Sequence, residues 1–173
     1  MRWCGVIAVV CLLGAQAAAA ASTDDADVQH WINTHAQRSQ SAELLSARSG
    51  VVGDLDGDAR DDLAVLYTLR PDGIHGQRSE RRYLAVFKRR GGTRNAPHYN
   101  RLYYHAHVLV GGAGVAEANR ATILNKTVVV ELLTPRAGDA ACCPTRPATR
   151  RYRLTPRGLT LVKAAAKAGV GMK

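Results

Sequence analysis

The chain has 173 residues and a formal net charge of +10 at pH 7, from 24 Lys and Arg residues against 14 Asp and Glu residues. No apolar stretch approaches the ~20 residues that a transmembrane helix requires, which excludes an ordinary membrane-spanning helix. Only five per cent of the residues are aromatic, so an aromatic platform for sugar binding has little material.

The first residues predict a cleavable signal peptide over 1–21. Arg2 begins it, an apolar run extends from Val6 to Leu13, and small residues fill positions 15–21. We therefore expect a periplasmic or secreted protein with a single calcium-binding, β-rich domain over 22–163 and a flexible tail over 164–173. Export makes a nucleic-acid partner improbable, and an acidic protein or a cell-wall polymer fits the basic charge better.

A short amphipathic helix is predicted at the start of the mature chain. Ser22 and Asp25 can form a capping box, and Val28, Trp31, Ile32 and His35 then recur at helical spacing. We expect Trp31 to lie in the core. His35 has no partner at a metal-ligand spacing, so a packed histidine is expected there.

An acidic loop follows between two apolar runs, and its spacing predicts a calcium site. Asp54, Asp56, Asp58 and Asp62 fall at positions 1, 3, 5 and 9, and the backbone carbonyl of Arg60 falls at position 7. Such an all-oxygen shell suits Ca²⁺, which takes six to eight oxygen ligands. Carboxylates within ~5 Å of one another repel by roughly 3 kcal/mol per pair at a dielectric near 20, and a divalent cation removes that cost.

The loop is not an EF-hand. Position 6 holds Ala59 in place of glycine, and position 12 holds Val65 in place of the bidentate glutamate. A strand is predicted directly after it, because Leu63, Val65, Tyr67 and Leu69 can share one face at a period of two. The alternative is an acidic, solvated turn without a metal.

Short runs of strand character, separated by turns rich in glycine and proline, continue to the end of the chain. They predict a mainly β fold, an antiparallel sandwich, barrel or propeller-like sheet of about seven strands with one short N-terminal helix. The expected strands are 48–52, 63–69, 82–88, 102–110, 127–133, 150–154 and 159–163.

The pattern Asp-x-Asp-Gly-Asp-x-x-x-Asp followed by an apolar strand resembles the calcium loop of FG-GAP and VCBS-type repeats. The resemblance covers residues 49–69 in a single copy, with Ala59 where that family often has glycine. It implies bound Ca²⁺. Because no second acidic loop occurs, the remaining strands must complete the core without further calcium loops of this kind.

Two further groups of residues are candidate sites. His105 and His107 are expected on the same face of a strand, where they could share a metal, but no third ligand is identifiable. No arrangement of nucleophile and base, or of paired carboxylates, stands out, so an enzyme is not expected.

The basic residues of the later strands are expected to form a surface for an acidic partner: Arg81, Arg82, Lys88, Arg89 and Arg90.

The adjacent Cys142 and Cys143 are the only cysteines after the signal peptide. In an oxidising compartment they predict either a strained disulfide with each other or an intermolecular disulfide, and both alternatives remain open. Ala-Cys-Cys-Pro with the later Tyr152-Arg153-Leu154 and Gly158-Leu159 resembles the tail of small exported bacterial proteins. Some of these are similar to periplasmic immunity proteins and lysozyme inhibitors, which implies protein binding.

The expected function is therefore an exported, non-catalytic, calcium-binding domain that interacts with another exported protein, such as a cell-wall (peptidoglycan) hydrolase that it inhibits. One alternative is a cell-wall or glycan-binding module. The other is an uncharacterised exported hydrolase.

Overall fold

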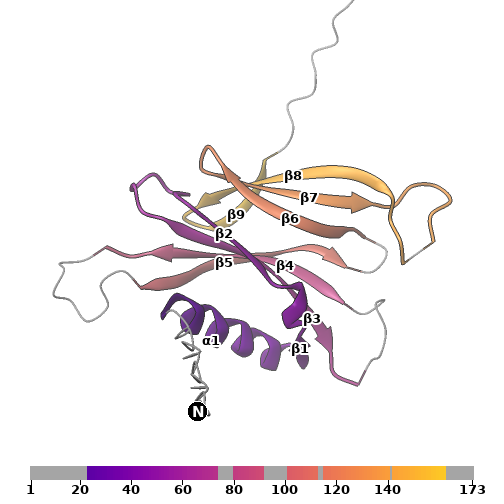
Figure 1. Ribbon diagram of the computed structural model, residues 1–173, viewed down its shortest axis with the longest axis horizontal. Helices are drawn as coiled ribbons and strands as arrows, with labels where there is room; N and C mark the ends of the chain where they lie inside the picture. Colours follow the sequence, from indigo (N-terminus) through magenta and orange to yellow (C-terminus); the bar gives the residue numbers. More distant parts are fainter. Residues whose placement is uncertain (1–22, 74–79, 92–100, 113–114, 141, 163–173) are drawn as a thin grey trace, which may run out of the picture.

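A computed structural model describes residues 23–73, 80–91, 101–112, 115–140 and 142–162. The predicted signal peptide and the predicted tail lie outside these residues. Three layers make up the fold: a helix, a five-stranded sheet and a four-stranded sheet (Figure 1). The helix is α1 (Thr23–Arg38).

Both sheets are antiparallel, and they face each other as a β-sandwich. Sheet A runs in the order β1-β3-β4-β5, with β2 also paired to β3, and its strands are β1 (Ser41–Glu43), β2 (Ser49–Gly53), β3 (Asp62–Pro71), β4 (Arg81–Arg89) and β5 (Leu102–Gly112). Sheet B runs in sequence order through β6 (Glu117–Leu124), β7 (Thr127–Thr134), β8 (Arg146–Thr155) and β9 (Gly158–Val162). The predicted mainly β fold is confirmed, as a sandwich.

The structure contains two strands, β1 and β6, that the sequence did not predict. β1 has only three residues and is followed by a 3-10 turn, η1 (Leu45–Ala47). β6 presents two alanines to the core, Ala118 and Ala121, and Ile123 near its end supplies the larger apolar side chain, so its apolar pattern is weak. A register shift between Ala118 and Arg120 also breaks its alternation.

The two central strands of sheet A bury both faces. Leu66 and Leu84 are register partners on the face turned to sheet B, and Tyr67 and Tyr83 are partners on the face turned to the helix. This explains the nearly continuous apolar runs of β3 and β4, since each residue enters one of two cores. The predicted common face of Leu63, Val65, Tyr67 and Leu69 is confirmed as the helix face.

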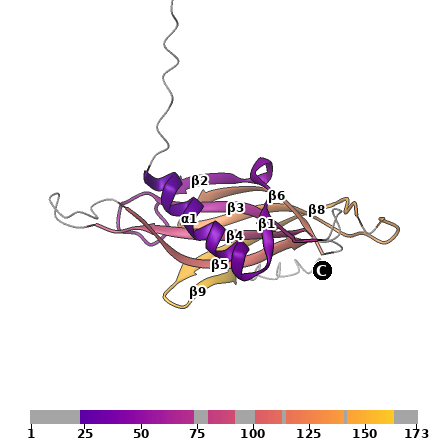
Figure 2. The same ribbon diagram turned by 90° about the horizontal axis from the view of Figure 1, so that it is seen from below.

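α1 covers the outer face of sheet A and lies obliquely across its strands (Figure 2). Val28, Ile32 and Ala36 are buried at a spacing of four, as one helix face requires. Ion pairs from the first turns of the helix, Asp24 with Arg89 and Asp27 with Arg101, fix it to β4 and to the start of β5. None of the described helices is both long and apolar enough to span a membrane.

At one end of the sandwich the chain passes from sheet A to sheet B. Gly112 forms an isolated bridge with Ala116 just after β5 ends. A Cβ on Gly111 would lie 2.6 Å from the carbonyl oxygen of Ala116, so only glycine fits there. Gly111 and Gly112 therefore lie where the chain passes from sheet A to sheet B.

Candidate metal centre

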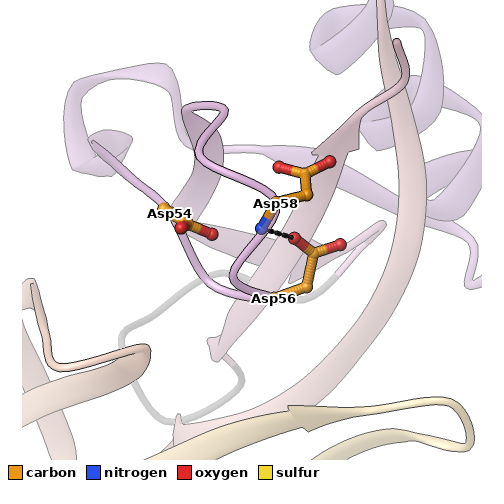
Figure 3. Close-up of side chains that lie close together, drawn as sticks. All are labelled: Asp54, Asp56 and Asp58. Atoms are coloured by element: carbon orange, nitrogen blue, oxygen red, sulfur yellow. Dashed lines mark hydrogen bonds between the residues drawn. The ribbon is translucent and has the colours of Figure 1, made fainter.

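The acidic loop, residues 54–61, closes the hairpin between β2 and β3, whose last register pair is Gly53 with Asp62. Asp54, Asp56 and Asp58 each bring a carboxylate oxygen to within 4.8 Å of the other two (Figure 3). Three of the four predicted carboxylate ligands are thus gathered by one short loop. Leu55, between two of these aspartates, is buried in the inter-sheet core.

Backbone N–H groups of the loop hold these carboxylates in place. Asp54 accepts hydrogen bonds from the N–H groups of Gly57 and Ala59 at 2.6 and 3.2 Å, and Asp56 accepts one from Asp58 at 3.2 Å (Figure 3). Asp58 in turn accepts one from Arg60 at 2.9 Å. Gly57 adopts a φ of 92°, which lets the loop curl back on itself.

Asp62 lies apart from the three-carboxylate cluster, at the start of β3. It is fully buried, and its two oxygens accept hydrogen bonds from the N–H groups of Leu55 and Arg89 at 3.1 and 3.0 Å. Burial, opposed by these hydrogen bonds, raises the pKa of Asp62. Asp62 therefore fastens the loop to β4, and its role as a ligand stays a prediction.

Arg60, the predicted carbonyl ligand, is exposed in the same loop. Its guanidinium lies 3.5 Å from the carboxylate of Asp58. The role of its carbonyl oxygen also stays a prediction.

A lysine from a neighbouring strand lies against the cluster. Nζ of Lys88 on β4 is 2.5 Å from Asp56, and this hydrogen bond lowers the pKa of Asp56 and raises that of Lys88. The amine of Lys126, from the turn between β6 and β7, lies close to Gly57. Sequence reasoning missed Lys88 as a neighbour, although pairing of Leu63 with Phe87 places it beside the loop.

The three-carboxylate cluster can hold a metal ion. Its ligand atoms are all carboxylate oxygens, which favour hard cations over the softer transition metals. Three carboxylates leave positions for carbonyl oxygens or water, as a site of six or more ligands requires.

The predicted common face of His105 and His107 is wrong. β5 contains a register shift beside the pairs Val86–Ala106 and Phe87–Tyr104, so the alternation of its side chains is broken there. Nε2 of His105 lies 3.0 Å from the carbonyl oxygen of Thr155 on β8, whereas His107 faces the helix. The two imidazoles do not share a site.

His107 instead joins an aromatic cluster between α1 and sheet A. Its ring centroid lies 4.6 Å from that of His35, and Nδ1 of His35 lies 2.7 Å from the hydroxyl of Tyr67. Trp31 stacks on Tyr104 at 4.2 Å. The prediction of a packed His35 is confirmed, and Trp31 packs against the helix-side core, where it remains partly exposed.

The predicted basic surface on β4 is also wrong in part. Lys88 and Arg89 are neutralised within the chain by Asp56 and Asp24. Arg82 turns toward the space between the sheets, where it donates a hydrogen bond to Thr68. These five basic residues therefore do not form one free positive surface.

Cys142 and Cys143 lie in the connection between β7 and β8, and both are exposed free thiols. A hydrogen bond between the two side chains raises the pKa of Cys143. The structure has no disulfide between Cys142 and Cys143, and the alternative, an intermolecular disulfide, stays a prediction.

No protein family, curated protein or solved structure matches the chain.

Proposed function

We propose that the chain is an exported, non-catalytic β-sandwich domain whose acidic loop binds Ca²⁺. The observation that carries this proposal is the convergence of Asp54, Asp56 and Asp58, with one oxygen from each within 4.8 Å of the others. Calcium is favoured over magnesium because the loop offers several carboxylates at once. Mg²⁺ is usually bound by one or two carboxylates and keeps its waters.

Bound calcium would stabilise the end of the sandwich where three elements meet. The loop is tied to β4 through Asp62 and through Lys88, so ordering the loop also orders the contact between β2, β3 and β4. A cation that binds only the folded loop shifts the unfolding equilibrium toward the folded state.

The partner that we propose is another exported protein, a peptidoglycan hydrolase that this domain inhibits. The support is the resemblance of the Ala-Cys-Cys-Pro region to small exported inhibitors and immunity proteins. Cys142 and Cys143 lie on an exposed connection at one end of the sandwich, where a second protein can reach them.

The two alternatives have less support. The indole ring of Trp31 packs against the rings of Tyr67, Phe87 and Tyr104, so little of its face is free to stack on a sugar. A hydrolase that uses a carboxylic acid as its general acid would need an accessible carboxyl group with a raised pKa. Asp62 has a raised pKa, but its side chain is fully buried.

The experiment is thermal unfolding with calcium and with a chelator. Calcium at a hundredfold excess over its dissociation constant stabilises by ~2.7 kcal/mol, so chelation should lower the melting temperature by several degrees. Asp56→Ala should abolish this response because it removes a ligand oxygen.

Asp61→Ala is the matched control, since Asp61 lies in the same loop but outside the three-carboxylate cluster. It should leave the calcium response intact. The assignment would be overturned if the two substitutions changed the calcium response equally, or if the chelator left the melting temperature unchanged.

A further inference from the structure

A cavity of about 560 Å³ opens at the end of the sandwich where β5 passes into β6. Side chains from both sheets and from the β7–β8 connection line it, including Thr68, Glu80, Arg82, Glu117, Asn119 and Thr145. Gly112, Ala116 and Ala118 also line it, and these small residues leave the space that larger core residues fill elsewhere. Its volume falls within the ~300–1,000 Å³ of small-molecule sites.

Arg82 occupies a core position of β4 at this cavity. Leu84 and Val86 of the same strand face sheet B and are fully buried, and Arg82 continues their row by the alternation of a strand. Its Nη1 donates a hydrogen bond to the hydroxyl of Thr68 at 3.1 Å. The inward direction of Arg82 could have been predicted from the sequence, because residues two apart on a strand share a face and Leu84 is buried.

The Nε–H group of Arg82 is buried and has no hydrogen-bond partner. Burial is also the main cause that lowers the pKa of Arg82. A buried donor without an acceptor is costly, and native structures rarely leave one without a functional reason. A carboxylate is the acceptor whose geometry best matches the guanidinium.

The other charged residues at the cavity, Glu80 and Glu117, indicate which second charged group the ligand has. Glu80 is already paired with Arg70 at 2.5 Å, so its charge is neutralised. Glu117 lies near enough to Arg82 to raise its pKa, but among the described residues no ion pair is recorded for Glu117. The cavity therefore offers one cation and one anion to a ligand.

We propose that this cavity binds a small zwitterion, of amino-acid to dipeptide size, whose carboxylate accepts from Arg82 and whose ammonium group pairs with Glu117. A purely anionic ligand would leave Glu117 unpaired beside a second negative charge, and a purely cationic ligand would leave the Arg82 donor unsatisfied. The site is separate from the acidic loop, and its occupation does not depend on calcium.

The test is nuclear magnetic resonance of the arginine Nε–H groups in the ¹⁵N-labelled full chain. Glycine, β-alanine and glycylglycine serve as zwitterionic probes with increasing charge separation, and acetate and methylammonium serve as single-charge probes. We expect the Arg82 Nε–H resonance to shift and saturate with at least one zwitterion, at a dissociation constant of about 1 mM or tighter. Acetate should bind at least tenfold more weakly, and methylammonium should not shift it.

Two variants with matched controls assign the two contacts. Because Arg82→Lys removes the Nε–H group itself, binding to the variants is followed by the backbone amide resonances of Asn119 and Thr145, which line the cavity. Arg82→Lys should abolish binding while Arg81→Lys, on the exposed side of the same strand, should not. Glu117→Gln should reduce zwitterion affinity to that of acetate, while Glu131→Gln on β7 should leave it unchanged. Three results would each overturn the proposal. They are chemical shifts of Arg82 that no probe saturates, a dissociation constant for acetate as low as that for the zwitterions, and an unchanged zwitterion affinity in Glu117→Gln.

Discussion

The ammonium group of Lys88 lies beside the carboxylate of Asp56 and neutralises it, as a bound cation would. Its Nζ is 2.5 Å from the carboxylate, so a cation that uses Asp56 must compete with this ion pair. Partly exposed pairs of this kind contribute about 0.2–1 kcal/mol.

We expect Lys88→Met to increase calcium affinity by up to about fivefold, since the ion no longer displaces the ammonium group. Isothermal titration calorimetry with CaCl₂ measures this change. Arg90→Met, an exposed basic residue just beyond the same strand, is the control and should alter the affinity less. Weaker binding in Lys88→Met would mean that the lysine helps to shape the loop.

Ala59 is the second residue of interest in the loop, because it adopts a φ of 62°. Side chains other than glycine are strained in this left-handed region. Position 59 is also where the resembling family often has glycine.

We expect Ala59→Gly to increase the free energy of unfolding by about 1 kcal/mol, because glycine adopts this conformation without strain. Chemical denaturation in calcium-free buffer measures it. Ala137→Gly is the control, since Ala137 lies in an exposed turn without a positive φ, and it should not stabilise. Destabilisation by Ala59→Gly would contradict the backbone assignment.

At the scale of elements, the contact between α1 and sheet A contains two histidines that face each other. Burial lowers the pKa of both His35 and His107 from the usual value of 6.5, and the positive charges of His107 and Arg38 lower the pKa of His35 further. Tyr67, Tyr83, Tyr104 and Trp31 complete the surroundings of the pair. No acidic side chain of the described residues forms an ion pair with either histidine.

We expect stability to fall as the pH drops below about 6.5, where the unfolded histidines bind protons before the folded ones. The unfolded state then holds more protons than the folded state, so acidification favours unfolding. Denaturation curves between pH 7.5 and 5 measure the effect. His107→Gln should flatten the dependence and His30→Gln, an exposed residue of the same helix, should not; identical slopes would exclude this pair as the cause.

The elements that the sequence predicted well are those with strong period-two or helical apolar patterns. β3 and β4 belong to this class because their side chains fill two distinct cores, and α1 belongs to it because one face of the helix packs on the helix-side core. β6 was missed because alanines face the core there, and the separation of His105 from His107 was missed because a register shift has no mark in one sequence. Of the candidate site, the three clustered carboxylates follow from spacing within one loop, whereas Lys88 comes from a strand that only pairing brings near.

At the scale of the whole molecule, the positive charge is unevenly neutralised. All six ion pairs among the described residues join partners that precede residue 102. Residues 117–162 contain eight Lys and Arg residues against three acidic residues. Arg151 and Arg153 are exposed and flank the buried Tyr152 on β8, so they point away from the core.

We expect an acidic partner to bind over sheet B, and its binding to weaken with salt because exposed charges are screened. The immobilised chain would be exposed to periplasmic extract, and the captured material assayed for peptidoglycan hydrolysis. Arg151→Glu with Arg153→Glu should reduce capture at least tenfold. The control, Arg81→Glu with Arg90→Glu at and just beyond the two ends of β4, should retain capture. Equal losses in both double variants, or capture that does not change with salt, would place the partner elsewhere.

The passage between the sheets at Gly111 and Gly112 divides the chain at a single point. Every strand of sheet A precedes it and every strand of sheet B follows it. Each sheet can thus assemble from local hairpins, which form faster than pairings between distant segments. Without sheet B, sheet A would expose Leu66, Leu84 and Val86, an apolar face of the kind that promotes aggregation. Sheet B, which follows sheet A in the chain, is the part of the molecule that covers this face, so we expect a chain truncated after sheet A to aggregate.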